Sequence, residues 1–191
     1  MEKRVKLQIA YYRSLDVARV SDTTASRVYE SLVRGERATP ADRKALEDYL
    51  LRIVARDAGT NGLALHIHTG EGGGPFFDTP GSSPLLLTSL LNDYSLRNTT
   101  FVLVHGGFPF DRATATLIKK PNVYADFSGL LFFVSPSLAS QTLRLWLETF
   151  PEKVLFGTDA FDLADSGLRG WEELGWVANH DGRRALAIAL T

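Results

Sequence analysis

One stretch decides how this chain folds: Leu65-His66-Ile67-His68-Thr69-Gly70. Two later segments have the same form, Val102-Leu103-Val104-His105-Gly106-Gly107 and Val154-Leu155-Phe156-Gly157-Thr158-Asp159. Each is an apolar run of strand character that leads to a residue able to bind metal or move protons. In a parallel α/β barrel the C-terminal ends of the strands surround the active site, so side chains at those ends indicate chemistry. Together the three endings predict a hydrolytic metal site.

Strand-like and helix-like runs alternate along the whole chain, as in βα units around a parallel sheet. The runs expected to form strands are 5–15, 63–69, 100–105, 122–127 and 154–158. Helices are expected over 22–35, 39–59, 84–96, 112–119, 136–150 and from 183 onward. In the second helix Thr39 is the expected N-cap, Pro40 the first helical residue. Its expected apolar face is Leu46, Tyr49, Leu50, Ile53 and Val54.

This order of elements predicts an α/β fold, a partial TIM-type (β/α) barrel with about five parallel strands. A complete barrel of this type has eight strands and about 250 residues. The first strand begins almost at the N-terminus, and the apolar pattern of 185–190 stops without a cap, so both ends look cut. We expect one domain over residues 1–191, with a helical insertion at about 21–60. A complete open sheet of five strands is the alternative.

Composition excludes several classes of function. The 45% hydrophobic and 23% charged fractions are those of an ordinary globular domain. A net charge of -1 gives no electrostatic reason to expect a nucleic acid or an anionic membrane surface as partner. Cysteine is absent, so any metal must be held by histidine, carboxylate or modified lysine, which suits Zn²⁺. No signal peptide or membrane span of about 20 apolar residues is evident, so a cytoplasmic protein is expected.

The candidate metal ligands are His68, His66 and Asp159. His66 and His68 are two apart on a strand, so they face the same side and can reach one ion. His68 is nearer the strand's end, whereas His66 lies one layer deeper and could instead be a core residue bonded to the backbone. Asp159 can bind a divalent cation and accept a proton, although Asp is also a common N-cap.

His105 is the other candidate catalytic residue, together with Asp159. It follows a continuous apolar run that predicts burial on both faces of the strand. Gly106-Gly107 then allows close approach of backbone or substrate. The glycine-rich segment 70–74 fits neither nucleotide-binding fingerprint and is interpreted as a mobile loop over the site. Lys6 and Arg13 are either surface charges or residues that face the pocket.

These residues resemble the amidohydrolase superfamily, most of all its amidohydrolase-2 group of metal-dependent hydrolases and decarboxylases. Within that group the chain is similar to the amidohydrolase domains that are fused to glutamine-synthetase-like domains. The runs that carry the resemblance are Ala10-Tyr11-Tyr12-Arg13-Ser14-Leu15, His68-Thr69-Gly70, Pro84-Leu85-Leu86-Leu87, His105-Gly106-Gly107-Phe108-Pro109, Pro121-Asn122-Val123-Tyr124-Ala125-Asp126 and Gly157-Thr158-Asp159. They follow one another in the family's order.

The resemblance implies that the strands are the fourth to eighth of the barrel. His68 then matches the fifth-strand metal ligand, His105 the sixth-strand histidine and Asp159 the eighth-strand aspartate, while Lys6 matches a fourth-strand lysine. The pair His66-x-His68 could instead imitate the family's first-strand H-x-H pair. That alternative is rejected, because only two strands separate it from Asp159, whereas six separate the first strand from the eighth.

The expected activity is therefore hydrolysis of a small amide, ester or carboxylate, or decarboxylation, by metal-activated water with a divalent ion such as Zn²⁺. The first-strand H-x-H pair is missing, so the chain alone is expected to be weakly active or inactive. We expect a small-molecule substrate, and association with a second copy or another chain along the open sheet edges. The alternative function is non-catalytic: a degenerate barrel fragment that binds a ligand or assembles with another chain.

Overall fold

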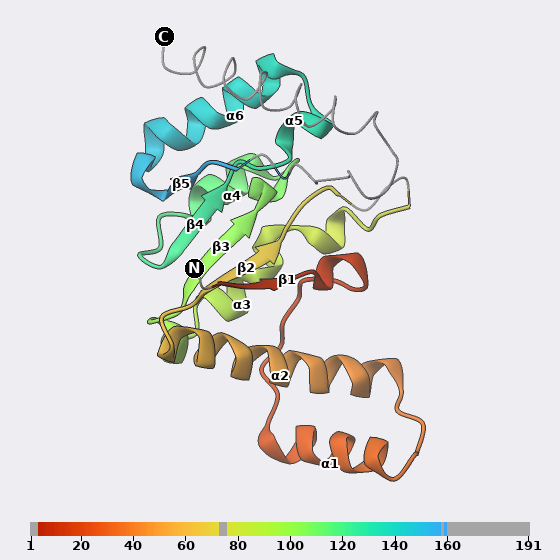
Figure 1. Cartoon of the computed structure of the whole chain (residues 1–191). Helices are drawn as coiled ribbons and strands as arrows, with labels where there is room; N and C mark the ends of the chain where they lie inside the picture. The colour runs from red at the N-terminus through yellow and green to blue at the C-terminus, as the bar shows by residue number, and fades with distance from the viewer. Residues whose placement is uncertain (1–3, 73–75, 158, 160–191) are drawn as a thin grey trace, which may run out of the picture.

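The structure, a computed structural model, describes residues 4–72, 76–157 and 159. Its centre is one sheet of parallel strands in the order β1-β2-β3-β4-β5 (Figure 1). The strands are β1 (Arg4–Leu7), β2 (Ala64–His68), β3 (Thr100–Val104), β4 (Val123–Asp126) and β5 (Val154–Leu155). Parallel neighbours in chain order place all their C-terminal ends along one edge. The predicted sheet of five parallel strands is confirmed.

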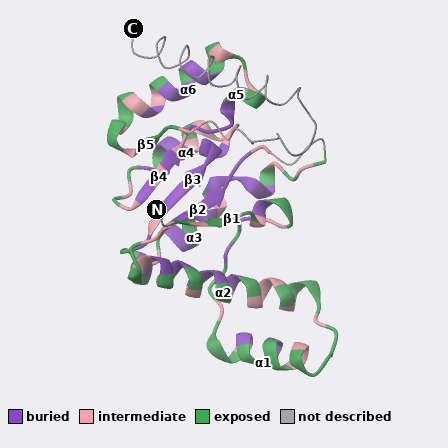
Figure 2. Cartoon of the chain, viewed as in Figure 1, coloured by how far each residue is buried: buried purple, intermediate pink, exposed green. Residues whose placement is uncertain are grey.

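The central strands β2 and β3 are mostly buried (Figure 2), and the two faces of the sheet carry different kinds of side chain. Alternate side chains point to opposite faces of a strand. One face is fully buried and consists of Leu65, Ile67, Phe101, Leu103, Val123 and Ala125. These side chains form a single core with residues of the surrounding helices. The other face carries polar side chains that are exposed or half-buried, namely Lys6, His66, Tyr124 and Asp126. Helices therefore cover one face, and the second face is the one that lines the interior of a barrel.

Two long helices, α1 (Asp22–Val33) and α2 (Pro40–Thr60), occupy the region 21–60, where the insertion was predicted. Helix α2 lies beside the sheet, and α1 packs against α2 on the side away from the sheet (Figure 1). The side chain of Thr39 accepts a hydrogen bond from the Asp42 N–H, so the predicted cap is confirmed. The predicted buried face of α2 is wrong, because Leu50 and Val54 are exposed. The residues that α2 buries are Asp48, Leu51, Arg52, Ala55 and Ala58. Since α2 contacts α1 as well as the sheet, its apolar residues are shared between two sides.

The buried charges of α2 are fixed by ion pairs. Asp48 accepts hydrogen bonds from Lys44 at 2.7 Å and from the Ala18 N–H at 3.0 Å. Arg13 also contacts Asp48, at 2.8 Å, and Glu47, at 2.7 Å. Arg13 is thus a structural cation, and the idea that it faces the catalytic pocket is not supported.

Two predicted elements have different bounds in the structure. The first strand ends at Leu7 instead of continuing to residue 15, and a 3-10 turn over Ile9–Tyr11 follows. The helix predicted over 84–96 is divided into Pro84–Leu87, α3 (Thr88–Leu91) and Tyr94–Leu96. The break falls at Asp93, whose carboxylate accepts the N–H and hydroxyl of Ser95 and so begins a new turn.

The remaining helices are α4 (Asp111–Leu117), α5 (Leu130–Phe133) and α6 (Pro136–Thr149). Ser135 caps α6 by accepting a hydrogen bond from the Leu138 N–H. The helix predicted from 183 onward lies outside the described residues. No helix in the described ranges is long and apolar enough to cross a membrane.

Trp146 is the largest side chain in the core and closes it behind the site. Its ring is fully buried and lies against Gly106, and its indole N–H donates to the Asp111 carbonyl at 3.0 Å. We predict that Trp146→Ala lowers the free energy of unfolding by about 3–5 kcal/mol, because a cavity replaces the ring. Leu138→Ala, on the exposed part of the same helix, is the control and should change it by less than about 1 kcal/mol. Urea denaturation followed by circular dichroism measures both, and equal losses would contradict this account.

Candidate active site

His68 is the last residue of β2 and is almost completely buried, at 1% exposure. Its Nε2 atom is buried and has no hydrogen-bond partner among the described residues. The ring of Tyr11 lies over the imidazole, with centroids 4.4 Å apart. A Cβ on Gly72 would come within 2.9 Å of Nε2, so a side chain at this position would crowd that nitrogen. A buried nitrogen without a partner is costly in a core and is a common feature of a binding site.

His105 follows β3 directly and is held in an unusual conformation. Its φ of 65° lies in the left-handed region, which non-glycine residues rarely adopt. The Nδ1 atom is 2.8 Å from the Ser128 carbonyl oxygen, which can only accept, so Nδ1 carries the proton. In the neutral ring, Nε2 then presents a lone pair. The rings of His105 and His68 are 4.8 Å apart between centroids.

Asp159 lies just after β5 and completes the group. Its Oδ2 is 3.8 Å from His105 Nε2, and its Oδ1 is 3.9 Å from the Lys6 ammonium. The φ of Asp159 is 56°. In the described ranges, the non-glycine residues with positive φ are Asp159 and His105. Strained backbone of this kind is concentrated at functional sites. The prediction that His68, His105 and Asp159 gather at one end of the sheet is confirmed.

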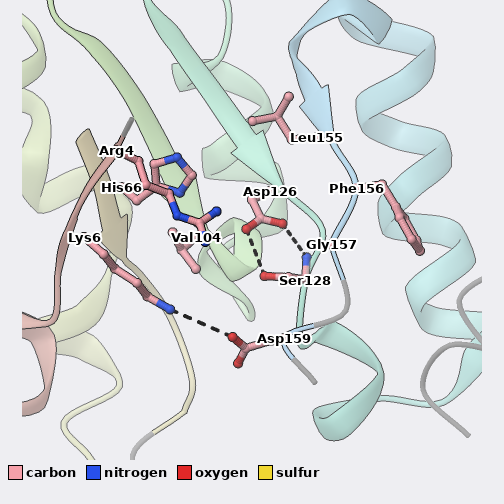
Figure 3. A pocket seen from close by; sticks show the side chains of 10 residues that line it. All are labelled: Arg4, Lys6, His66, Val104, Asp126, Ser128, Leu155, Phe156, Gly157 and Asp159. Carbon is pink, nitrogen blue, oxygen red and sulfur yellow. Dashed lines mark hydrogen bonds and ion pairs between the residues drawn. The ribbon is translucent and has the colours of Figure 1, made fainter. Parts of the chain in front are cut away.

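An open pocket of about 360 Å³ lies beside Asp159 on the polar face of the sheet (Figure 3), and His68 and His105 are not among its lining residues. Its lining residues are Arg4, Lys6, His66, Val104, Asp126, Ser128, Leu155, Phe156, Gly157 and Asp159. Figure 3 shows Lys6 and His66 on one wall, with Asp126 and Ser128 on the other. His66 is half-buried and lines the pocket, so it is not simply a core residue. Lys6 also faces the pocket.

The surroundings of His68 keep it neutral. Burial lowers its pKa from 6.5 to about 4, and the positive charges that His105 and Lys6 can carry act in the same direction. The pKa of Tyr11 is raised, first by burial and then by the negative charge of Asp159. The pair therefore presents a neutral imidazole beside a protonated hydroxyl at neutral pH.

The described residues fit a bound divalent metal only in part. The donor types are suitable, since imidazole and carboxylate both bind Zn²⁺. Among the described residues, however, there is no group of three histidines or carboxylates placed to hold one ion. His68, His66 and Asp159 therefore do not form a closed ligand set in this part of the chain.

Sequence reasoning did not single out Tyr11, Asp126 or Ser128 as site residues. Tyr11 contacts His68 only because the chain turns after β1, and no local pattern indicates that contact. Asp126-Phe127-Ser128 did carry a usable signal, because Asp two residues before Ser is typical of a side-chain turn. Of the glycine-rich segment, Gly70 and Gly72 pack beside the site. The mobility predicted for this segment is untested, and part of it falls outside the described residues.

Comparisons with known proteins agree with the fold. The sequence profile of the amidohydrolase family matches residues 15–181. A protein from Lactobacillus casei, assigned as a metal-dependent hydrolase, superposes with a TM-score of 0.74 at 27% sequence identity. The superposition covers 96% of this chain and 46% of that protein. No curated protein sequence matches the chain.

Two more distant structures share the fold alone. An amidohydrolase from Burkholderia multivorans with bound zinc has a TM-score of 0.54 at 17% identity, over 88% of this chain and 65% of that one. Glucuronate isomerase from Caulobacter crescentus has the same TM-score at 18% identity, over 98% of this chain and 40% of that one. The chain thus spans less than two thirds of each of these structures. These likenesses confirm the predicted partial α/β barrel.

Gly129 tests how tightly the His105 ring is held. A Cβ at Gly129 would lie 2.7 Å from His105 Nδ1, and its φ is +70°. Gly35 has nearly the same φ, +77°, with nothing within 4 Å, so it is a matched control for backbone strain. We predict that Gly35→Ala costs about 1 kcal/mol and Gly129→Ala clearly more, because the latter also displaces the imidazole. Chemical denaturation measures the difference, and equal costs would show that the ring is free to move.

The depressed pKa of His68 predicts a loss of stability in acid. The unfolded state takes up a proton near pH 6.5 and the folded state only near pH 4, so stability is complete above 6.5 and falls as the pH drops toward 4. The loss should be on the order of 2–3 kcal/mol. In urea melts with a chelator present, His68→Gln should remove this pH dependence, whereas the half-buried control His66→Gln should retain it. A wild-type curve that is flat between pH 4 and 6.5 would refute the assignment.

Proposed function

We propose a function on one premise: the chain belongs to the amidohydrolase family. The protein is a metal-dependent hydrolase domain that acts on a small amide, ester or carboxylate, by hydrolysis or decarboxylation. The observation that carries this proposal is the meeting of His68, His105 and Asp159 at the C-terminal edge of the sheet. That edge is where parallel barrels place their catalytic groups.

The residues have distinct roles in this proposal. Asp159 is the general base, because it is partly exposed to the pocket, at 26%, and its carboxylate can accept a proton from the attacking water. His105 is the second catalytic residue and acts through Nε2, which faces Asp159. The ammonium of Lys6 lies 3.9 Å from the Asp159 carboxylate and places a positive charge beside the reacting groups. A small-molecule substrate occupies the pocket between β1 and β5.

A divalent ion such as Zn²⁺ belongs to the proposal, since members of the family use divalent metals. His68 and Asp159 would hold it, with His66 as a further candidate, and it would polarise an oxygen as a Lewis acid. Because the described residues do not complete a ligand set, the remaining ligands must come from elsewhere. We infer that β1 to β5 correspond to the fourth to eighth strands of a complete barrel. The missing ligands would then be the H-x-H pair of the first strand.

A non-catalytic role is the alternative, in which the domain binds a ligand or assembles with another chain. The incomplete ligand set among the described residues favours this role. In the described part of the chain, β1 and β5 each pair with a single strand and so leave backbone groups at both sheet edges unpaired. Pairing with a second copy or with another chain would cover these edges. In the enzyme as proposed, the same edges would adjoin the first three strands.

Zinc titration distinguishes the two functions. We expect isothermal titration of the metal-free chain to show about one weak Zn²⁺ site. The affinity should fall at least tenfold in His68→Gln and in Asp159→Asn, because each removes a ligand. Glu148→Gln, at an exposed helical ion pair, is the control and should bind like the wild type. Absence of any zinc site in the wild-type chain would support the non-catalytic role.

The isolated chain should also self-associate and show little hydrolase activity, because two ligands and three strands of the complete site are not supplied by β1–β5. Light scattering measures the association, and hydrolysis of simple amide and ester substrates with added Zn²⁺ measures the activity. A monomer with ordinary enzymatic rates would show that the chain builds a complete site by itself.

A further inference from the structure

Asp126, at the end of β4, binds the residue that holds His105. Its Oδ1 accepts a hydrogen bond from the Ser128 N–H at 2.7 Å, and its Oδ2 accepts one from the Ser128 hydroxyl at 2.9 Å (Figure 3). Both hydrogen-bond donors of Ser128 are therefore directed at a single carboxylate. Asp126 in turn uses both of its oxygens on Ser128.

As a result, Ser128 presents only acceptors to His105. Its carbonyl oxygen is 2.8 Å from Nδ1 and its hydroxyl oxygen is 3.3 Å from the same atom. Because the hydroxyl proton is directed at Asp126, it cannot be donated to the imidazole. The other neutral tautomer would place the lone pair of Nδ1 against two oxygens in a buried position, which is unfavourable.

We propose that Asp126 is a positioning residue that fixes His105 in the tautomer protonated at Nδ1. The carboxylate acts through Ser128 and does not itself touch the imidazole in this arrangement. A catalytic role of His105 rests on the proposed function. The effect of Asp126 on the tautomer of His105 does not depend on that function.

Burial and packing restrict the His105 ring to this position. His105 is 4% exposed and Ser128 is 5% exposed, so water has little access to replace the hydrogen bonds. Gly129 lies directly against the imidazole, where a Cβ would be 2.7 Å from Nδ1. The left-handed φ of 65° at His105 sets the direction of the ring. The ring therefore has little freedom to find another partner.

The fixed tautomer determines what the site can hold between His105 and Asp159. Nε2 carries a lone pair, and Asp159 Oδ2, 3.8 Å away, is also an acceptor. Two acceptors at this separation attract a cation or a group that bears hydrogen, such as water, a hydroxyl or an amide N–H. They repel a carbonyl oxygen. Neutral His105 is thus suited to receive a proton or bind a cation, and not to polarise a substrate carbonyl by donating a hydrogen bond.

Nitrogen NMR of the histidine rings tests the proposal directly and needs neither metal nor substrate. The chain has four histidines, so a ¹⁵N-labelled sample gives a simple spectrum in which His105→Asn identifies the relevant signals. In the metal-free wild type at neutral pH we expect the His105 Nδ1 signal to be of the protonated type and the Nε2 signal of the unprotonated type. The reverse assignment would overturn the proposal.

Asp126→Asn is the decisive variant. The amide can still accept the Ser128 N–H, but its NH₂ group cannot accept the hydroxyl proton, which is then free to be donated to Nδ1. We expect the ratio of the Nδ1–H to the Nε2–H form to fall about fivefold, the factor expected for one hydrogen bond. An unchanged ratio would show that the Ser128 carbonyl alone fixes the tautomer and that Asp126 is merely structural.

Two further variants separate the mechanism from a general disturbance. Ser128→Ala should keep the wild-type tautomer, and Asp126→Asn added to it should have no further effect, because the hydroxyl is absent. A full effect of Asp126→Asn in the Ser128→Ala background would refute the role given to the hydroxyl. Ser95→Ala is the control, since the N–H and hydroxyl of Ser95 also donate to the carboxylate two residues earlier, in this case both to Asp93 Oδ1, away from the site. If Asp126→Asn changes the tautomer but no variant or wild type binds Zn²⁺, the positioning role stands and only the metal-dependent function fails.

Discussion

The parallel pairing of five strands in chain order is the constraint on which the site depends. Because every strand runs in the same direction, each contributes its C-terminal end to one edge of the sheet. Each end then supplies one part of the site. These parts are Tyr11 after β1, His68 at the end of β2, His105 after β3, Ser128 after β4 and Asp159 after β5. The register reinforces this arrangement, since His68 pairs with Val104 and so lies beside the residue that precedes His105. A shift of one residue in that pairing would turn the polar ends into the apolar core.

Backbone strain at two of these strand ends is the second feature that determines the geometry of the site. A strand that continued straight past Val104 would carry the His105 side chain away from the site. The left-handed φ at His105 turns the chain, and the one at Asp159 does the same after β5. Each such residue costs on the order of 1 kcal/mol or more, so packing must hold it in place. Around His105 that packing comes from Trp146 against Gly106 and from Gly129 beneath the ring.

Local patterns in the sequence were sufficient for the number and order of the strands, the Thr39 cap and the residues at the strand ends, although the first strand was predicted to be too long. Apolar runs that lead to His68, His105 and Asp159 predicted where the site lies, because strand direction follows from the alternation of strands and helices. The buried face of α2 was predicted wrongly, since contact with α1 on one side and the sheet on the other cannot be inferred from periodicity alone. The contact of Tyr11 with His68 and the pairing of Ser128 with His105 join residues 57 and 23 positions apart, and no local pattern specifies such approaches. The completion of the metal site is likewise a tertiary property, and neither the spacing of His66 and His68 nor the described structure supplies a third convergent ligand.

The open face of the sheet explains why Asp159 depends on its backbone more than on its ion pair. Lys6 is 42% exposed, and its ammonium is 3.9 Å from the carboxylate. An ion pair of this length in contact with solvent contributes at most about 1 kcal/mol, and salt weakens it further. A neutral His105 offers Asp159 no hydrogen bond, because its Nε2 is then an acceptor. The carboxylate is therefore placed chiefly by the conformation of the chain, with its negative charge only loosely compensated. A carboxylate held in this way attracts a cation or a proton, and any element that covered this face would strengthen that attraction by excluding water.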